Sequence, residues 1–402
     1  MTNSSALYQV QKNYFKSRAT YPLAFRKAQL RKLKHLILLN EKKVYTALKA
    51  DFQKSEFEAF VTELGGVIKS IDLHLKKMKQ WSKPQRVKSG LANFPSSSYI
   101  YREPYGVCLI IAPWNYPFLL ALEPLVAAIA AGNCAVIKPS ELTTHTASLL
   151  AQIINESFPK EYLRVVEGGV EETTNLLQQP FHKIYFTGSS RVGKIVMKAA
   201  AEHLTPVTLE LGGKSPCVVD EDASIDLAAK RIAWGKFLNA GQTCIAPDYL
   251  LVHHSIKKEF ISALKTAILE LYGNNPQSNP DFQRIINKAH FQRINKLMTN
   301  EKIAHGGEVD SKENFIAPTL LDNITSDSPI MQEEVFGPVL PILSFREVAE
   351  VEKQIGNHPT PLAFYYFGKQ NTEHFLQNIE FGGACINDTI SHLVNHNLPF
   401  GG

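Results

Sequence analysis

Two side chains that can do covalent chemistry, a carboxylate and a thiol, flank one predicted helix. Glu210 lies on an apolar strand that ends at a double glycine, and Cys244 follows a glycine turn. Residues 225–238 between them are apolar at helical spacing. A thiolate that attacks carbon, followed by hydrolysis by a carboxylate-activated water, uses this pair of groups. The alternative is an inert buried cysteine and a salt-bridged glutamate.

Two further segments place polar side chains at the ends of predicted strands. Asn115 lies between prolines, where its amide can donate a hydrogen bond to a developing oxyanion or simply form a turn. Lys138 and Glu141 can hold the ribose hydroxyls of a nucleotide. In the alternative reading, Ser140 caps a helix there and Glu141 lies in its first turn.

A glycine turn with hydroxyl groups precedes a predicted helix at residues 186–193. Gly188, Ser189 and Gly193 there suit a pyrophosphate, because free N–H groups and the helix dipole point toward such a turn. The segment is not the G-x-G-x-x-G dinucleotide fingerprint, so its ligand stays open at this point. Farther along, Glu334 and Phe336 precede a Gly-Pro turn. The alternative for this segment is a solvated acidic loop with one buried phenylalanine.

Composition excludes several classes of protein. The net charge of +5 over 402 residues is too small for a dedicated nucleic-acid-binding protein. Five cysteines without paired spacing fit reduced thiols and a cytoplasmic location. The most apolar region, residues 107–137, is interrupted by prolines and a glutamate, so we expect no transmembrane segment. The adjacent histidines at 253 and 254 lack supporting ligands, and no metal site is predicted.

Short apolar strands alternate with helices from residue 105 onward, which predicts an α/β fold with Rossmann-like parallel sheets. Strands are predicted over 106–112, 134–138, 163–167, 183–187, 206–211, 217–220, 249–252, 338–345 and 363–366. Helices are predicted within 20–82 and over 118–131, 144–157, 171–178, 191–203, 225–238, 255–271 and 283–300. Strand character at 98–101 suggests a hairpin before the first alternating block. Ligands of such sheets bind at the carboxyl ends of the strands.

Taken together, the motifs resemble the aldehyde dehydrogenase superfamily, and the resemblance covers nearly the whole chain. The motifs occur in the family's order as Pro113-Trp114-Asn115, Lys138-Pro139-Ser140-Glu141, Phe186-Thr187-Gly188-Ser189, Leu209-Glu210-Leu211-Gly212-Gly213-Lys214, Gly241-Gln242-Thr243-Cys244, Glu334-Val335-Phe336-Gly337-Pro338, Asn387 and Pro399-Phe400-Gly401-Gly402. The short amino-terminal arm and the sequence after Cys244 look most like class 3, which includes fatty and aromatic aldehyde enzymes.

The resemblance implies NAD(P)-dependent oxidation of an aldehyde to its carboxylic acid. Cys244 would be the nucleophile that forms a thiohemiacetal and then a thioester, Glu210 would activate the hydrolytic water, and the Asn115 amide and the Cys244 N–H would hold the oxyanion. The implied cofactor-binding residues are Trp114, Lys138, Glu141, Gly188, Ser189, Gly193, Glu334 and Phe336. Among these, Lys138 and Glu141 would hold the adenine ribose, Ser189 a phosphate, and Glu334 with Phe336 the nicotinamide ribose and ring. The carboxylate of Glu141 favours NAD, but class 3 enzymes often accept NADP as well.

The resemblance also implies a domain plan. We expect an NAD(P)-binding domain over 1–82 and 103–210, a catalytic domain over 211–388, and a small oligomerisation hairpin and bridging segment over 83–102 and 389–402. Because family members continue past the Pro-Phe-Gly-Gly motif, the carboxyl-terminal part is expected to be truncated. A homodimer is expected if that tail is not essential.

Three other functions compete with aldehyde oxidation. A truncated, catalytically silent homologue would bind nucleotide without turnover. A CoA-acylating aldehyde dehydrogenase would usually lack a carboxylate at position 210, so Glu210 argues against it. A plain cysteine hydrolase would cleave esters without using the nucleotide-binding residues.

Overall fold

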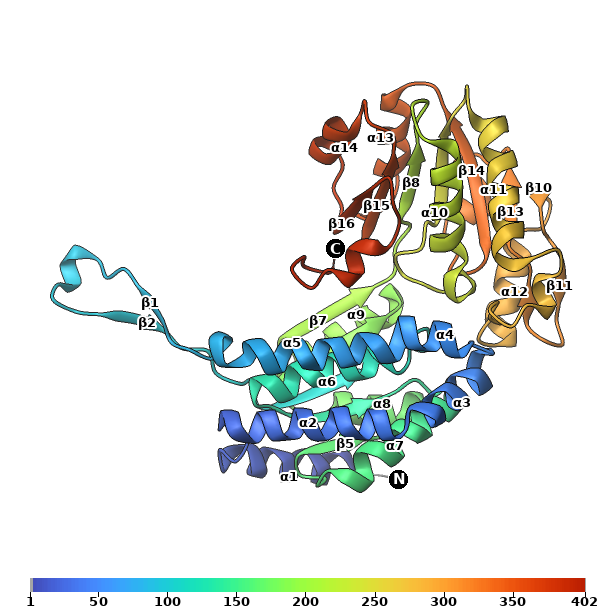
Figure 1. Ribbon diagram of the computed structural model, residues 1–402. Coiled ribbons are helices and arrows are strands. Elements are labelled where there is room, and N and C mark those ends of the chain that lie inside the picture. The colour runs from blue at the N-terminus through green and yellow to red at the C-terminus, as the bar shows by residue number, and fades with distance from the viewer. Residues whose placement is uncertain (1–2, 402) are drawn as a thin grey trace. The chain divides into compact units, whose positions relative to one another are not determined.

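The computed structural model describes residues 3–401, which form two α/β units, so the predicted fold class is confirmed (Figure 1). The first unit comprises Met1–Asp51 with Ala59–Leu209, and the second comprises Phe52–Glu58 with Glu210–Gly402. Residues 1, 2 and 402, the last of which closes the Pro-Phe-Gly-Gly motif, lie outside the described residues. The functional names of the predicted domains stay predictions.

The first unit contains a five-stranded sheet of order β5-β4-β3-β6-β7. Its strands are β3 (Val107–Ile111), β4 (Cys134–Lys138), β5 (Leu163–Val165), β6 (Lys183–Gly188) and β7 (Val207–Leu211). The central strand β3 runs parallel to both β4 and β6. Every residue of β3 and β4 is buried, as expected for parallel strands that are covered on both faces.

Helices of the first unit cover this sheet and one another. They are α1 (Ser4–Lys16), α2 (Leu23–Leu39), α3 (Glu41–Phe52), α5 (Gly65–Trp81), α6 (Leu119–Ala131), α7 (Thr144–Ser157), α8 (Val170–Leu177) and α9 (Ser190–Ala201), with a π-helical turn over Phe60–Leu64. The short helix α4 (Glu56–Ala59) lies largely in the Phe52–Glu58 segment of the second unit. Helix α1, which packs on β3 and β4, was not predicted, because its buried face includes only two apolar side chains. A short antiparallel hairpin of β1 (Gln85–Val87) and β2 (Ser98–Ile100), joined through the 3₁₀ turn Leu91–Asn93, confirms the predicted excursion.

The second unit contains a seven-stranded sheet of order β10-β13-β14-β9-β8-β15-β16. Its strands are β8 (Pro216–Val219), β9 (Tyr249–His253), β10 (Lys302–His305), β13 (Thr319–Asp322), β14 (Val339–Phe345), β15 (Ala363–Phe367) and β16 (Gly383–Ile386). Strand β10 runs antiparallel to β13 at one edge, whereas the other pairs are parallel. A two-stranded hairpin of β11 (Val309–Asp310) and β12 (Phe315–Ile316) lies outside this sheet.

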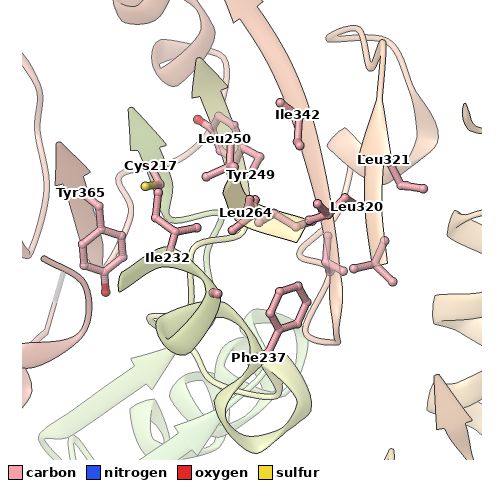
Figure 2. Close-up of a cluster of buried hydrophobic side chains, with 14 of the residues drawn as sticks. Cys217, Ile232, Phe237, Tyr249, Leu250, Leu264, Leu320, Leu321, Ile342 and Tyr365 are labelled. Atoms are coloured by element: carbon pink, nitrogen blue, oxygen red, sulfur yellow. The ribbon is translucent and has the colours of Figure 1, made fainter. Parts of the chain in front are cut away.

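Side chains from the sheet and helices of the second unit form its core (Figure 2). The helices are α10 (Ile225–Phe237), α11 (Lys257–Tyr272), α12 (Lys288–Leu297), α13 (Val348–Gly356) and α14 (Thr372–Asn378), with 3₁₀ turns η3 (Leu238–Gly241), η4 (Pro276–Ser278), η5 (Pro329–Met331) and η6 (Ser391–Val394). Ile232 and Phe237 of α10 and Leu264 of α11 are fully buried there. Helix α10 therefore gains its position from packing against α11 in this core.

The predicted helix over 283–300 is wrong at its first turn. Helix α12 begins only at Lys288, after Asn287, whose side chain accepts a hydrogen bond from the His290 N–H. The residues before it are held out of the helix, because the backbone N–H groups of Arg284 and Ile285 donate to the carbonyls of Phe52 and Asn314. Tertiary hydrogen bonds of this kind override helical periodicity.

Asp51 caps helix α7, which follows the Lys138 strand. Its carboxylate accepts hydrogen bonds from the N–H groups of His145 and Thr146, at 3.1 and 2.9 Å. The local cap residue, Thr143, makes no side-chain capping bond. A distant carboxylate thus satisfies two N–H groups that the helix itself leaves unbonded.

We therefore expect Asp51→Ala to destabilise α7 by about 1–2 kcal/mol. Native-state hydrogen exchange should show faster exchange of the α7 amides. Asp72→Ala is the matched control, because Asp72 makes only an exposed ion pair with Lys34. Equal exchange of α7 in both variants would contradict the capping role.

Candidate active site

Three predicted site residues of the first unit lie at one edge of its sheet. Asn115 follows β3, Lys138 ends β4 and Gly188 ends β6. Because β4, β3 and β6 are adjacent and parallel, their carboxyl ends meet at the same edge. Trp114 precedes Asn115, which is buried, in the same turn. The structure thus brings these residues together where ligands of parallel sheets bind.

Lys138 and Glu141 form a pair of opposite charges at this edge. The Lys138 ammonium is buried and donates a hydrogen bond to the Pro139 carbonyl at 2.7 Å. It lies 3.7 Å from the Glu141 carboxylate, which is half exposed to solvent. Burial lowers the pKa of Lys138, and Glu141 and Glu172 oppose that shift. A cation and an accessible carboxylate side by side fit a ribose with two hydroxyl groups.

The turn between β6 and α9 has the form of a phosphate site. Ser189 is the N-cap of α9, where its hydroxyl accepts a hydrogen bond from the Val192 N–H at 3.4 Å. Gly193 is buried in the first turn of the helix. The Thr187 hydroxyl is also buried and has no hydrogen-bond partner among residues 3–401. An unpaired hydroxyl beside the amino end of a helix fits the phosphates of a dinucleotide.

In the second unit, a sharp turn presents Cys244. The 3₁₀ turn η3 contains Asn239 with a left-handed φ of 54°, followed by Gly241 with a φ of 73°. A Cβ atom on Gly241 would lie 2.2 Å from the Gly337 carbonyl oxygen, so this close approach requires glycine. The predicted glycine turn is present, and its backbone places Cys244 near the segment that carries Glu334.

The Cys244 thiol is surrounded by protein but keeps partial contact with solvent. Burial raises its pKa to about 12, and the carboxylates of Glu334 and Glu210 contribute to this rise because they disfavour a second negative charge. The structure therefore brings the predicted nucleophile within electrostatic reach of both predicted carboxylates. A protein group must take up the thiol proton before attack at neutral pH.

Glu210 has the properties of a general base. Burial raises the pKa of its carboxyl above the ordinary value. Its Oε2 atom is buried and makes no hydrogen bond within the described residues. An acceptor without a protein partner is available to a water or to a proton from a neighbouring thiol, and a raised pKa makes a carboxylate a stronger base.

Glu334 occupies a position that the sequence did not predict. Its Oε2 atom lies 2.1 Å from where a Cβ atom on Gly212 would be, and the Gly213 N–H donates a hydrogen bond to its carboxylate. The carboxylate thus packs at the end of the strand that carries Glu210. Burial, assisted by Asp248, raises the pKa of Glu334 to about 8. Phe336 follows with a left-handed φ of 45°.

A buried ion pair holds the segment that carries Glu334. The Lys214 ammonium donates to the Asp248 carboxylate at 2.5 Å and to the carbonyls of Ile330 and Glu333 at 3.0 and 2.8 Å. Asp248 also accepts a hydrogen bond from the Val335 N–H at 2.9 Å. Sequence reasoning gave neither residue a role, although both adjoin the motifs of Glu210 and Cys244.

Lys236, on the last turn of α10, is a further residue that sequence reasoning missed. Its side chain is fully buried, and its Nζ atom has no hydrogen-bond partner among the residues described. Burial lowers its pKa to about 8, while Asp248 and Glu334 act in the opposite direction. The one sequence signal for a role of Lys236 is its position eight residues before Cys244, on a helix whose pattern otherwise predicts a core helix.

Comparison with known proteins identifies the family. The model of the family described as "Aldehyde dehydrogenase family" matches residues 4–402. This chain belongs to the aldehyde dehydrogenase family. The 4,4'-diaponeurosporen-aldehyde dehydrogenase of Staphylococcus aureus is 50% identical over 97% of this chain and 86% of its own length.

Two mammalian relatives are similar over most of their length. Aldehyde dehydrogenase family 3 member A2 of Rattus norvegicus is 45% identical over 96% of this chain and 81% of the relative. The enzyme of Mus musculus named "Aldehyde dehydrogenase, dimeric NADP-preferring" is 45% identical over 100% of this chain and 89% of the relative. The name of the Rattus norvegicus relative agrees with the predicted likeness to class 3.

A solved structure matches the fold closely. The substrate-bound state of Staphylococcus aureus AldH aligns with a TM-score of 0.98 and 48% identity, over 100% of this chain and 89% of that chain. The predicted family, fold class and activity as an aldehyde dehydrogenase are therefore confirmed, and the competing functions are not favoured. Among residues 3–401, no helix is both long enough and apolar enough to cross a membrane.

We expect Lys236→Met to raise the unfolding temperature at pH 7. A buried ammonium without a partner is costly, and a methionine of similar length fills its space. Because the folded-state pKa lies below the unfolded value, this cost is fully present below about pH 8 and fades as the pH rises toward 10.5. The gain over wild type in a thermal melt should therefore shrink above pH 8.

Lys230→Met on the same helix is the control, because Lys230 is exposed and pairs with Glu270 at 3.0 Å. Its unfolding temperature should stay close to wild type at every pH. A lower unfolding temperature for Lys236→Met would show that the ammonium stabilises the fold through its neighbouring carboxylates.

Proposed function

We propose that Cys244 and Glu210 carry out NAD(P)-dependent oxidation of an aldehyde to its carboxylic acid. The observation that supports this assignment best is a thiol within electrostatic reach of the Glu210 carboxylate, whose buried Oε2 atom makes no hydrogen bond within the described residues. Asn115 is proposed to bind the oxyanion together with the Cys244 N–H. No observation favours CoA acylation or a catalytically silent homologue, and Glu210 provides the base that hydrolysis needs.

The first chemical step forms a bond between Cys244 Sγ and the aldehyde carbon. The thiol proton passes to a neighbouring carboxylate, for which the raised pKa of Glu210 is suited. The carbonyl electron pair moves to oxygen, and the resulting thiohemiacetal oxyanion is held by hydrogen-bond donors. When bound, the nicotinamide cofactor accepts the hydride that leaves this carbon.

The second step hydrolyses the thioester left on Cys244. Glu210 first releases the thiol proton to solvent. It then removes a proton from water as the water oxygen attacks the acyl carbon, and the carbon–sulfur bond breaks to release the acid and restore the Cys244 thiolate. The proton taken up by Glu210 then leaves to solvent. Because this step needs ionised Glu210, its rate should rise with pH through a pKa above that of an ordinary glutamate.

The cofactor is proposed to be NAD or NADP. Lys138 and Glu141 would bind the adenine ribose, and the turn with Gly188, Ser189 and Gly193 would bind phosphate. Trp114, Glu334 and Phe336 complete the set. The half-exposed carboxylate of Glu141 supports NAD, whereas the relative named NADP-preferring supports acceptance of both.

The proposed working state is a cytoplasmic homodimer. The five cysteines are all free thiols, as expected in a reducing compartment, and Cys244 must be reduced to react. One relative is named dimeric, and the hairpin within 83–102 exposes Leu91 and Phe94 almost completely. This hairpin and residues 389–402 are proposed as oligomerisation segments, beside the NAD(P)-binding domain over 1–82 and 103–210 and the catalytic domain over 211–388.

Cys244→Ser should abolish aldehyde oxidation while nucleotide binding stays nearly unchanged. Turnover is followed by absorbance at 340 nm with NAD and then NADP, using 4,4'-diaponeurosporen-aldehyde or an aromatic aldehyde. Nucleotide binding is followed by protein fluorescence. Cys385→Ser should keep full turnover, and comparable steady-state rates in the two variants would refute the role of Cys244.

Glu210→Gln should allow one hydride transfer and then stall, because the amide cannot activate water. Stopped-flow absorbance should show a burst of about one equivalent of reduced cofactor, with steady turnover reduced by ~10²–10⁴-fold. Mass spectrometry of quenched protein should find the acyl group on Cys244. If Glu210→Gln shows no burst and keeps the wild-type steady-state rate of aldehyde oxidation, this assignment is overturned.

A further inference from the structure

The turn that presents Cys244 has an unusual backbone. Three successive residues, Asn239, Ala240 and Gly241, have left-handed φ angles of 54°, 51° and 73°. Asparagine and glycine tolerate this conformation, but in alanine the Cβ atom lies too close to the following carbonyl oxygen. Ala240 is also fully buried. A strained backbone of this kind persists only where surrounding contacts hold it, so those contacts fix the position of Cys244.

Two side chains of the turn hold it at its carboxyl end. The Asn239 side-chain amide donates a hydrogen bond to the Gln242 carbonyl at 3.1 Å, and the Gln242 amide donates to the Asn239 carbonyl at 3.0 Å. Gln242, which is fully buried, also donates to the Arg284 carbonyl at 3.1 Å and accepts from the Ile286 N–H at 3.0 Å. These bonds tie the residue two positions before Cys244 to the segment that precedes α12.

Glu58 holds the amino end of the same turn. It belongs to the segment Phe52–Glu58, which is part of the second unit although Glu58 lies 181 residues before Asn239 in the chain. One oxygen of its buried carboxylate accepts a hydrogen bond from the Asn239 N–H at 2.9 Å, and the other accepts from the Gln283 side-chain amide. Asn239 and Gln283 are buried as well. Loss of this acceptor would deprive a buried N–H group of a hydrogen bond, which is costly.

We propose that Glu58 is a positioning residue for Cys244, because its carboxylate keeps the turn of Asn239, Ala240 and Gly241 in its left-handed conformation. Without that acceptor, rearrangement of the turn is favoured, since the Asn239 N–H then finds another partner and Ala240 returns to an ordinary φ. Such a rearrangement moves the thiol, and a misplacement of about 1 Å can cost ~10²-fold in rate. The inference rests on the proposed role of Cys244 as nucleophile and adds a distant residue that holds it in place.

Two substitutions separate the reach of the Glu58 side chain from its charge. Glu58→Asp keeps the charge but shortens the side chain by one methylene group, which withdraws the acceptor from the Asn239 N–H. Glu58→Gln keeps the length and an acceptor oxygen, and Gln283 can rotate its own amide to accept from the new one. Both changes are milder than removal of the side chain, so both variants should fold.

The measured quantity is the single-turnover rate of hydride transfer from benzaldehyde, with protein in excess and NAD saturating, followed at 340 nm. Glu58→Asp should lower this rate ~10–10²-fold, whereas Glu58→Gln should stay close to wild type. Nucleotide affinity, followed by protein fluorescence, should be unchanged in both variants. Addition of Ala240→Gly to Glu58→Asp should restore most of the rate, because glycine adopts the left-handed conformation without a steric cost.

Asp220→Ala is the matched control in the same unit. Asp220 is a buried carboxylate that accepts hydrogen bonds from the Tyr366 hydroxyl at 2.9 Å and from the Asn371 side-chain amide at 2.7 Å. It follows the carboxyl end of β8, whereas the Cys244 turn precedes β9, which runs parallel to β8. This variant should lower the unfolding temperature at least as much as Glu58→Asp and leave the single-turnover rate unchanged.

Hydrogen exchange of the peptide over residues 238–246, measured without cofactor or aldehyde, follows the turn itself. Exchange should be faster in Glu58→Asp and as slow as in wild type in Glu58→Gln and Asp220→Ala. Because this readout does not depend on catalysis, it tests the hold of Glu58 on the turn even if Cys244→Ser shows that Cys244 is not the nucleophile.

Three results would overturn the inference. An unchanged single-turnover rate in Glu58→Asp would mean that the hold of Glu58 on the turn does not matter for the reaction. Equal losses in Glu58→Asp and Asp220→Ala would mean that the rate follows the stability of the unit. Equal losses in Glu58→Asp and Glu58→Gln would mean that the reach of the side chain is not what matters.

Discussion

The ion pair of Lys214 and Asp248 is the interaction on which the candidate site of the second unit depends most. Lys214 follows the strand end that carries Glu210, and Asp248 follows the turn that presents Cys244. Both also hydrogen-bond the backbone of the segment that carries Glu334. A buried ion pair is stabilising only when its remaining donors and acceptors are satisfied, and here the backbone satisfies them. This one ion pair therefore connects the three segments that carry Glu210, Cys244 and Glu334.

Closely spaced acidic groups determine the chemistry of this site. Burial raises the pKa of Glu210, Glu334 and Cys244 alike, because a low dielectric disfavours each anion. Ionisation of any one of them opposes ionisation of the others. Proton transfer between neighbours is therefore easier than release of several protons to solvent, which suits a reaction that alternates between thiolate attack and water activation. Lys236, buried without a hydrogen-bond partner in the described chain, belongs to the same set of coupled groups.

The sequence predicted elements well wherever periodicity and burial agree. Strand β4 and helix α7 have the predicted bounds, because one is a continuous apolar run and the other has a regular apolar face. The short strands β10 to β13 were missed, since two to four residues carry too little pattern. The first turn of the helix predicted over 283–300 was wrong because the Arg284 N–H donates to the carbonyl of Phe52, far away in the chain.

By itself, the sequence determined the family and the α/β class, and it singled out Cys244 and Glu210 as candidate reactive residues, because reactive residue types stand in ordered motifs next to strand ends and glycine turns. Only the tertiary structure decided what surrounds them. Three features depend on residues that are far apart in the chain. Glu334 packs on Gly212, Lys236 is buried without a hydrogen-bond partner within residues 3–401, and Asp51 caps α7. Their energies depend on distance and burial, which spacing along the chain does not encode.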